Sequence, residues 1–175
     1  MNGNPDVLAY VKAITYKYQI ENKAEVINLE HVIGIEYPQV LTQPWPRAFN
    51  YHVEFFTGEN PPSQVKQSIQ NHFKKGSEEH VLNIFSDKLN QLIPAYKGQG
   101  YLHAWSNVLM VRKLSPKDKK NYPSEIVVKK IQTFQDVSLV NSIEPDYPSS
   151  TNGLDDPIIN NLMAFYKGKI CAKSH

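Results

Sequence analysis

Histidine and cysteine are the side chains of this sequence that could most directly do acid–base or nucleophilic chemistry. The 175 residues include one cysteine, Cys171, and six histidines spread along the chain: His31, His52, His72, His80, His103 and His175. No two of these histidines lie at the short spacing that zinc sites use, so we expect no metal site. The short motifs of P-loops, dinucleotide-binding loops, zinc proteases and nucleophile elbows are also missing from the sequence.

Two histidines fall within segments that have the composition of strands. His52 and His103 could act as bases that line a cleft, although a histidine packed and hydrogen-bonded within a sheet is the commoner case. Cys171 has apolar neighbours and is expected to be a small core residue rather than a nucleophile. Tyr101 and Trp105 could stack on a ligand, but they suit the core side of a strand better. His52 and His103 are therefore the candidate bases.

The elements that must position these residues are clearest in the middle of the chain. Val65, Ile69 and Phe73 recur at helical spacing, which predicts a helix with Ser63 as its N-cap and Gly76 as its stop. The short apolar run 80–85 predicts a buried strand.

A second helix and a long strand are predicted to follow this run. Residues 89–96 restore the helical period, with Asp87 at the cap position. Gly98 and Gly100 end that helix, and residues 101–113 are rich in aromatic and β-branched side chains, which predicts a long strand. Alternation of strands and helices indicates an α/β (α+β) chain.

The N-terminal part of the sequence predicts one helix and further strands. Asn4 begins an amphipathic pattern that favours a packing helix over a partner-binding or membrane-surface helix. Residues 25–37 partly alternate and predict one or two strands, with Gly34 as a bulge or a point of close approach. Prolines mark an extended connector at 38–46, and residues 50–56 alternate as another strand.

The composition changes beyond Leu114. The lysine-rich segment 115–124 could be an anion-binding patch, but its mixed charges favour a solvated linker. A strand is then predicted at 126–131, followed by a helix that starts at Thr133 with an acidic residue three positions later. A weak helix is expected at 156–161 and a β-hairpin at 162–172. A second lobe therefore follows the linker.

Composition and charge disfavour several classes of protein. Nineteen basic and 17 acidic residues leave a formal charge of +2, so we expect no nucleic-acid partner. A single cysteine cannot form an intramolecular disulfide, which suits a reducing cytoplasm. No apolar run approaches the roughly 20 residues of a membrane span, so we expect a soluble protein that is not exported.

The order of the elements resembles a known family. Strand, helix, strand, helix, then Gly-Tyr and a long strand is similar to the C-terminal half of the GNAT (N-acetyltransferase) fold, a mixed and largely antiparallel sheet flanked by helices. The segment from 126 onward, with the hairpin sequence NLMAFYKGKICAKS, resembles the N-terminal half of that fold. The resemblance implies a GNAT-like lobe at 1–114, a linker at 115–124 and the N-terminal half of a second lobe at 125–175, which would look cut short.

This resemblance implies transfer of an acetyl group from acetyl-CoA, as the co-substrate, to a small-molecule or peptide amine. Tyr166 and its hairpin would line the acceptor cleft by position. The alternative is a non-catalytic GNAT-like module that binds a ligand or forms a homodimer through an open C-terminal sheet edge.

One departure from the family pattern bears on the co-substrate. The family binds the pyrophosphate of acyl-CoA with backbone N–H groups of an R/Q-x-x-G-x-G/A loop at a helix N-terminus. The corresponding residues 57–64 are TGENPPSQ, in which only Gly58 remains, while Pro61 and Pro62 have no N–H to donate. The first lobe is therefore not expected to bind CoA in the usual way.

Overall fold

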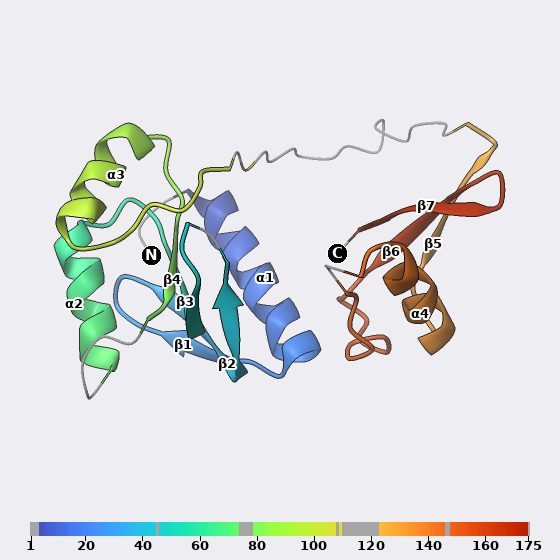
Figure 1. Cartoon of the computed structure of the whole chain (residues 1–175), viewed down its shortest axis with the longest axis horizontal. Helices are drawn as coiled ribbons and strands as arrows, with labels where there is room; N and C mark the ends of the chain where they lie inside the picture. The colour runs from blue at the N-terminus through green and yellow to red at the C-terminus, as the bar shows by residue number, and fades with distance from the viewer. Residues whose placement is uncertain are drawn as a thin grey trace. The chain divides into compact units, whose positions relative to one another are not determined.

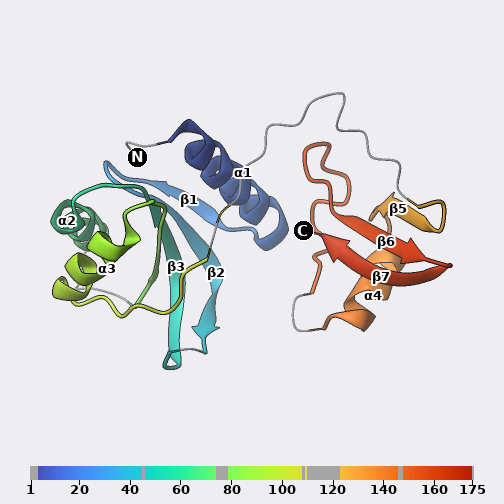
Figure 2. The same cartoon turned by 90° about the horizontal axis from the view of Figure 1, so that it is seen from above.

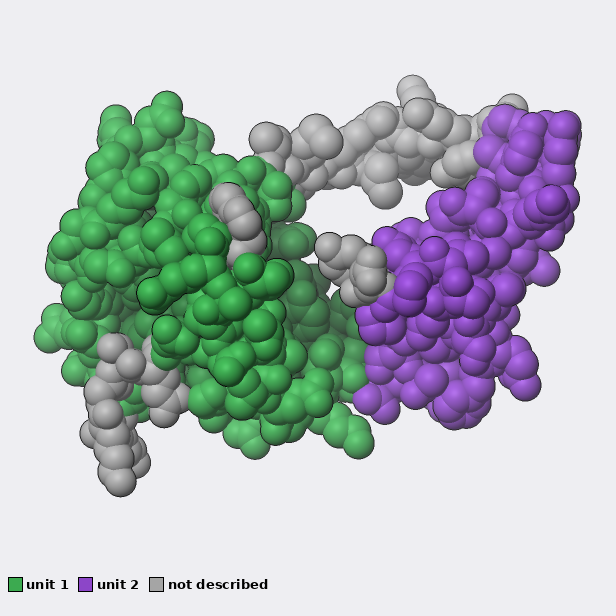
Figure 3. Space-filling view, in the orientation of Figure 1, with its two compact units in different colours: residues 1–111 green, residues 112–175 purple. Residues whose placement is uncertain are grey.

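The computed structural model describes residues 4–44, 46–73, 79–107, 109, 123–145 and 148–174. The chain divides into two compact units, unit 1 at residues 1–111 and unit 2 at residues 112–175 (Figure 3). Both units combine helices with strands, so the predicted α/β (α+β) class is confirmed. Most of the linker expected at 115–124 lies outside the described residues, which resume at Pro123.

Unit 1 is built on a mixed, largely antiparallel sheet (Figure 1). Its strands lie side by side in chain order: β1 (Glu25–Asn28), β2 (Ile33–Gln43), β3 (Phe49–Thr57) and β4 (Val81–Ile84). The first three are antiparallel, whereas β3 and β4 are parallel. A parallel pair needs a crossover connection, which helix α2 (Pro62–His72) supplies.

Helices cover both faces of this sheet. Helix α1 (Pro5–Asn22) packs on one face, and α2 packs with α3 (Leu89–Gly98) on the other (Figures 1 and 2). The first core cluster includes Val11 of α1 with Phe56 of β3, and the second includes Ile69 of α2 with Phe55 of β3. Consecutive residues of β3 therefore belong to opposite cores, as the pleat of a strand requires. The predicted packing role of the first helix is confirmed.

The helix starts in unit 1 differ in part from the prediction. The start of α1 is confirmed, since Asn4 Oδ1 accepts a hydrogen bond from the backbone N–H of Asp6 at 2.9 Å. The N-cap of α2 is Pro61 rather than Ser63. Pro62 suits the first helical position, so the helix begins earlier in the sequence than expected. The N-cap of α3 is Lys88 rather than Asp87.

Strand β2 is longer than the sequence indicated. It continues through Pro38 to Gln43, so the prediction of an extended connector at 38–46 is wrong for residues 38–43. The register between β2 and β3 shifts between Glu36 and Leu41, and such an irregularity is where a sheet tolerates a proline. Of the one or two strands expected within 25–37, the structure has two, β1 and the first part of β2.

The long strand expected at 101–113 is wrong for its described residues, because residues 101–107 and 109 form no strand. Composition favours a strand only where a neighbouring strand supplies hydrogen bonds. Instead, the N–H of Tyr101 bonds to the carbonyl of Tyr96 at 3.1 Å, which ties the segment to α3. Leu102 and Trp105 are 58% and 49% exposed rather than in the core. We call residues 101–107 the strap. The expected helix stop at Gly76 lies outside the described residues.

Unit 2 is a small sheet covered by one helix. Its strands pair antiparallel in the order β5 (Ile126–Lys130), β6 (Leu162–Tyr166) and β7 (Lys169–Ser174). Helix α4 (Phe134–Ile143) packs Val137 and Val140 against Ile131 and Met163. The predicted hairpin is confirmed, with Lys167 and Gly168 at positive φ in its turn.

The turns of unit 2 bear out one prediction and correct another. The capping box is confirmed, because Thr133 and Asp136 exchange side-chain to backbone hydrogen bonds at the start of α4. The helix expected at 156–161 is wrong. Asp156 Oδ1 accepts from the N–H groups of Ile158 and Ile159, which holds a local turn in place of a helix.

Candidate functional site

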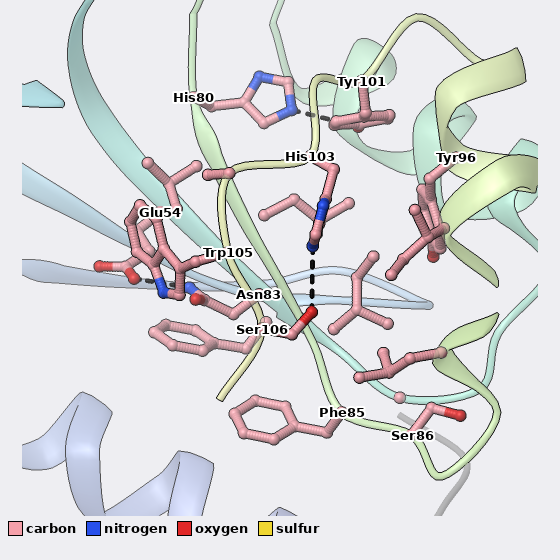
Figure 4. A pocket seen from close by; sticks show the side chains of 18 of the residues that line it. Glu54, His80, Asn83, Phe85, Ser86, Tyr96, Tyr101, His103, Trp105 and Ser106 are labelled. Carbon is pink, nitrogen blue, oxygen red and sulfur yellow. Dashed lines mark hydrogen bonds between the residues drawn. The ribbon is translucent and has the colours of Figure 1, made fainter. Parts of the chain in front are cut away.

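A groove of about 1590 Å³ runs along β4, which is the edge strand of the sheet in unit 1 (Figure 4). Its walls come from the N-terminal half of α1, from β3 and β4, from α2 and α3 and from the strap. Because these elements cover both faces of the sheet, the groove reaches around the edge of β4 from one face to the other.

A carboxylate lies in the middle of the sheet, on the wall of this groove. Glu54 of β3 accepts hydrogen bonds from the Tyr37 hydroxyl of β2 at 2.9 Å and from the Asn83 amide of β4 at 2.6 Å. Glu54 lies one residue away from Val53 and Phe55, which belong to the α2 and α3 side of the core, so it points to the α1 side. Three neighbouring strands therefore hold one carboxylate group.

The surroundings of Glu54 change its chemistry. Burial raises the pKa of its carboxyl above the ordinary value, and the hydrogen bonds from Asn83 and Tyr37 oppose that change only in part. Burial and the nearby Glu54 charge raise the pKa of Tyr18 to about 12 and that of Tyr37 still further. Both tyrosines therefore stay protonated near neutral pH. A carboxylate in this state can bind a cation or accept a proton from an amine.

Aromatic side chains line the groove together with Glu54. Tyr10 of α1 and Phe85, directly after β4, make an edge contact with 5.7 Å between ring centroids. Trp105 of the strap also lines the groove and is half-exposed (Figure 4). A carboxylate combined with aromatic faces is an environment that favours an ammonium group.

The α3 side of the groove carries a second set of polar groups. Tyr96 is only 3% exposed, and its hydroxyl has no hydrogen-bond partner among the described residues. Burial raises the pKa of Tyr96 to about 12, so the hydroxyl keeps its proton. Nearby, a ring nitrogen of His80 lies 3.2 Å from the Tyr101 hydroxyl, and one of His103 lies 3.0 Å from Ser106 Oγ (Figure 4).

The loop after β3 is held by side chains rather than left free to wrap a ligand. Thr57 Oγ1 and Asn60 Nδ2 both donate to the carbonyl of His31, at 2.9 and 3.0 Å. Glu59 accepts from Lys88 Nζ at 2.6 Å and from Ser86 Oγ at 2.8 Å. These two hydrogen bonds lower the pKa of Glu59 to about 2. Glu59 therefore stays ionised near neutral pH, in a salt bridge with Lys88.

This loop does not fit the pyrophosphate of acetyl-CoA. The Glu59 carboxylate would repel an anion placed against the loop, while its partner Lys88 is already engaged. Pro61, the N-cap of the helix that follows, and Pro62, its first residue, have no N–H, so this N-terminus lacks two donors that a phosphate could use. We therefore assign no acetyl-CoA site to unit 1.

Of the three candidate residues that the sequence indicated, two belong to unit 1 and one belongs to unit 2. His103 lies on the groove. His52 of β3 is not among the residues that line it, and its Nε2 lies 3.9 Å from Glu36 Oε1. Tyr166 belongs to β6 of unit 2, where it is half-exposed with Lys167 Nζ 5.2 Å from its ring centroid. Cys171 is exposed, so the expectation of a core cysteine is wrong. Its strand β7 is an edge strand of the three-stranded sheet.

Sequence reasoning missed Glu54 and Tyr96. Glu54 stands in the run VEFF, where its neighbours on the strand face one core and Glu54 faces the other. The signal was available, because the predicted N-terminal helix has to cover one face of that strand. Tyr96 belongs to the apolar pattern of its helix, and nothing in the sequence distinguishes its unpartnered hydroxyl.

Two further observations concern the described residues alone. They contain no group of three His, Cys, Asp or Glu side chains that could hold a metal ion. No helix among them is both long and apolar enough to cross a bilayer.

Comparisons of the chain with models of protein families, with curated proteins and with solved structures found no match.

Proposed function

We propose that the protein is N-acetyltransferase-like, of the GNAT type, and that unit 1 binds the acceptor amine in the groove around Glu54 without holding acetyl-CoA. The parallel pairing of β3 and β4 through α2 supports the GNAT assignment, whereas the described residues of the long strand expected at 101–113 form no strand and lend it no support. The observation that carries the amine assignment is the partly buried Glu54 carboxylate, held by Tyr37 and Asn83 on the wall of the groove.

The chemistry of Glu54 suits an amine in either of two protonation states. As a carboxylate it attracts an ammonium group, and the nearby aromatic rings add to that attraction. As a base with a raised pKa it is better matched to accepting a proton from an amine near neutral pH. Tyr37 and Asn83 fix the orientation of the carboxylate in both cases.

Acetyl-CoA remains the proposed co-substrate of the chemistry, but the loop after β3 does not fit it. The residues of unit 1 therefore carry amine recognition in this proposal, and no step of acyl transfer is assigned to them. Unit 1 is then a binding lobe of an acetyltransferase-like protein. This proposal combines the acetyltransferase and the non-catalytic binding module that the sequence left open as alternatives.

A calorimetric titration of the full chain with pentylamine tests the amine site. We expect saturable binding that Glu54→Gln weakens at least tenfold, or about 1.4 kcal/mol, because the amide removes the charge and keeps the shape. The matched control is Glu30→Gln, which neutralises a carboxylate that is 83% exposed and lies outside the groove. Equal binding by the wild type and Glu54→Gln would refute the proposal.

A second candidate function is dimerisation through unit 2. Among the described residues, β7 has a hydrogen-bonded neighbour only on its β6 side. An unpaired strand edge is a template for pairing with another chain. We propose a homodimer in which β7 pairs with β7 of a second copy.

A further inference from the structure

The outer edge of β4 has backbone groups that face the groove. The N–H of Phe85 bonds to the carbonyl of Thr57 on β3 at 2.9 Å. In an extended strand the N–H and C=O groups of successive residues point to opposite edges. The backbone groups of Leu82 and Ile84 therefore point away from β3, toward the outer edge.

The strap does not satisfy these groups. No backbone hydrogen bond between the described residues joins β4 to residues 101–107. Both segments nevertheless line the same groove, from Val81 to Phe85 on one side and from Tyr101 to Asn107 on the other. As far as the described residues go, the groove thus separates an unpaired edge of β4 from a strap that is partly exposed. An added strand would supply the missing hydrogen bonds.

We propose that this groove binds an extended peptide, which adds as a strand to the outer edge of β4 and directs a lysine side chain toward Glu54. This inference rests on the proposed function, because it names the class of amine that the Glu54 site accepts. The occupant is a peptide segment of another protein, bound through its backbone and selected by one side chain.

Distance and charge favour lysine at the position next to Glu54. A peptide strand beside β4 would lie two strand spacings from β3, or about 10 Å. The Glu54 carboxylate already reaches β4, where it lies 2.6 Å from Asn83 Nδ2, so a lysine stem can cover the remaining distance and a backbone N–H cannot. The ammonium group would meet a partly buried carboxylate and the aromatic side chains of Phe85 and Trp105. Charge complementarity therefore selects a basic side chain.

The opposite side of the sheet edge explains the unpartnered hydroxyl of Tyr96. Successive side chains of an added strand point to alternate faces, so the residues flanking the lysine would face α2 and α3. There the buried Tyr96 hydroxyl lacks a hydrogen-bond partner among the described residues. Leaving such a group unpaired is costly, and a polar side chain of the peptide can pair with it once the atoms that cover this buried hydroxyl move aside. Threonine residues beside the lysine suit this face.

Fluorescence anisotropy with a capped, labelled peptide tests the proposal on the full chain. The probe has seven residues, with a central lysine between two threonines. We expect the dissociation constant of the peptide to be at least tenfold lower than the inhibition constant of pentylamine in competition with it. Replacing the lysine by norleucine, or Glu54 by Gln in the protein, should weaken binding at least tenfold. Glu30→Gln should leave binding unchanged.

Backbone methylation tests strand addition itself. N-methyl groups on alternate peptide residues block the hydrogen bonds of one edge of the strand. One alternating set should therefore abolish binding, while the other set should leave it intact. Equal binding by the two methylated peptides would overturn the strand-addition model.

The outcomes separate this inference from the proposed function. Glu54-dependent binding of pentylamine with no tighter binding of the peptide would overturn the inference and leave the amine site standing. No binding of either ligand would overturn both. Slow hydrogen exchange at the amides of Leu82 and Ile84 in the free protein would also overturn the inference, because the edge of β4 would then be already paired.

Discussion

At the scale of single residues, the groove depends on a carboxylate that folding alone would not favour. Glu54 loses hydration on burial, and two hydrogen bonds only partly compensate, so its pKa is raised. A carboxylate that weakens the fold is commonly kept because it serves a site. The same property gives the residue a measurable effect on stability.

We predict that Glu54→Gln stabilises the protein at neutral pH. A folded-state pKa raised above the ordinary value near 4.5 means that stability is present below that value and is lost as the pH rises through the folded-state pKa. The variant lacks this loss, so it should melt roughly 2–4 °C above the wild type at pH 7, for about 1 kcal/mol. The difference should shrink toward pH 4 in thermal scans monitored by circular dichroism.

The exposed carboxylate Glu30 provides the control for the substitution itself. Glu30→Gln removes a carboxylate that is 83% exposed, so at pH 7 it should change the melting temperature by less than Glu54→Gln does. A difference between wild type and Glu54→Gln that is independent of pH, or that grows toward acid, would contradict the raised pKa.

At the scale of elements, the sheet of unit 1 depends on one close approach between strands. Gly34 of β2 lies opposite Phe55 of β3, and a Cβ on Gly34 would stand 2.8 Å from the Phe55 ring. This confirms the close approach that the sequence indicated at Gly34. The Phe55 ring belongs to the core with Val65 and Ile69, so it has little room to move.

We predict that Gly34→Ala destabilises unit 1 by about 1–3 kcal/mol, through overpacking against Phe55. Urea unfolding followed by tryptophan fluorescence measures it, because both tryptophans belong to residues 1–111. The matched control is Gly98→Ala at the end of α3, where an added Cβ meets no atom within 4 Å. A loss in Gly34→Ala no larger than the change in this control would argue against the close approach.

The sequence predicted most elements of both units, and its errors have physical causes. Periodicity located the helices and hairpin because those signals are local, as at the capping box of Thr133 and Asp136. It failed for the strap, because pairing of an edge strand depends on a neighbour that composition does not specify. It did not indicate Glu54 because the alternating pattern of β3 identifies the face that packs on α2 and α3, whereas the environment of the opposite face depends on α1, which is distant in the sequence.

At the scale of the whole molecule, the proposed homodimer brings two copies of β7 together. Antiparallel pairing of β7 about a two-fold axis at Cys171 would place Cys171 opposite the same residue of the second copy. This thiol is exposed in the single chain. A dimer formed in this way is therefore open to chemical trapping.

We predict that mild oxidation crosslinks the wild type into a covalent dimer and leaves Cys171→Ser uncrosslinked. Light scattering should give twice the mass of one chain for both proteins under reducing conditions, because the substitution does not remove backbone pairing. The mass of a single chain at high protein concentration would refute the dimer.

The central claim is that unit 1 binds an amine at Glu54 and does not hold acetyl-CoA with the loop after β3. The most direct test is an amide-resolved NMR titration of the full chain, with pentylamine and acetyl-CoA added separately. We predict that pentylamine shifts the side-chain signals of Asn83 and Trp105, and that Glu54→Gln removes both shifts. Acetyl-CoA should leave the amides of residues 58–64 unchanged. Shifts at 58–64 with acetyl-CoA, without shifts at Asn83 with pentylamine, would contradict the claim.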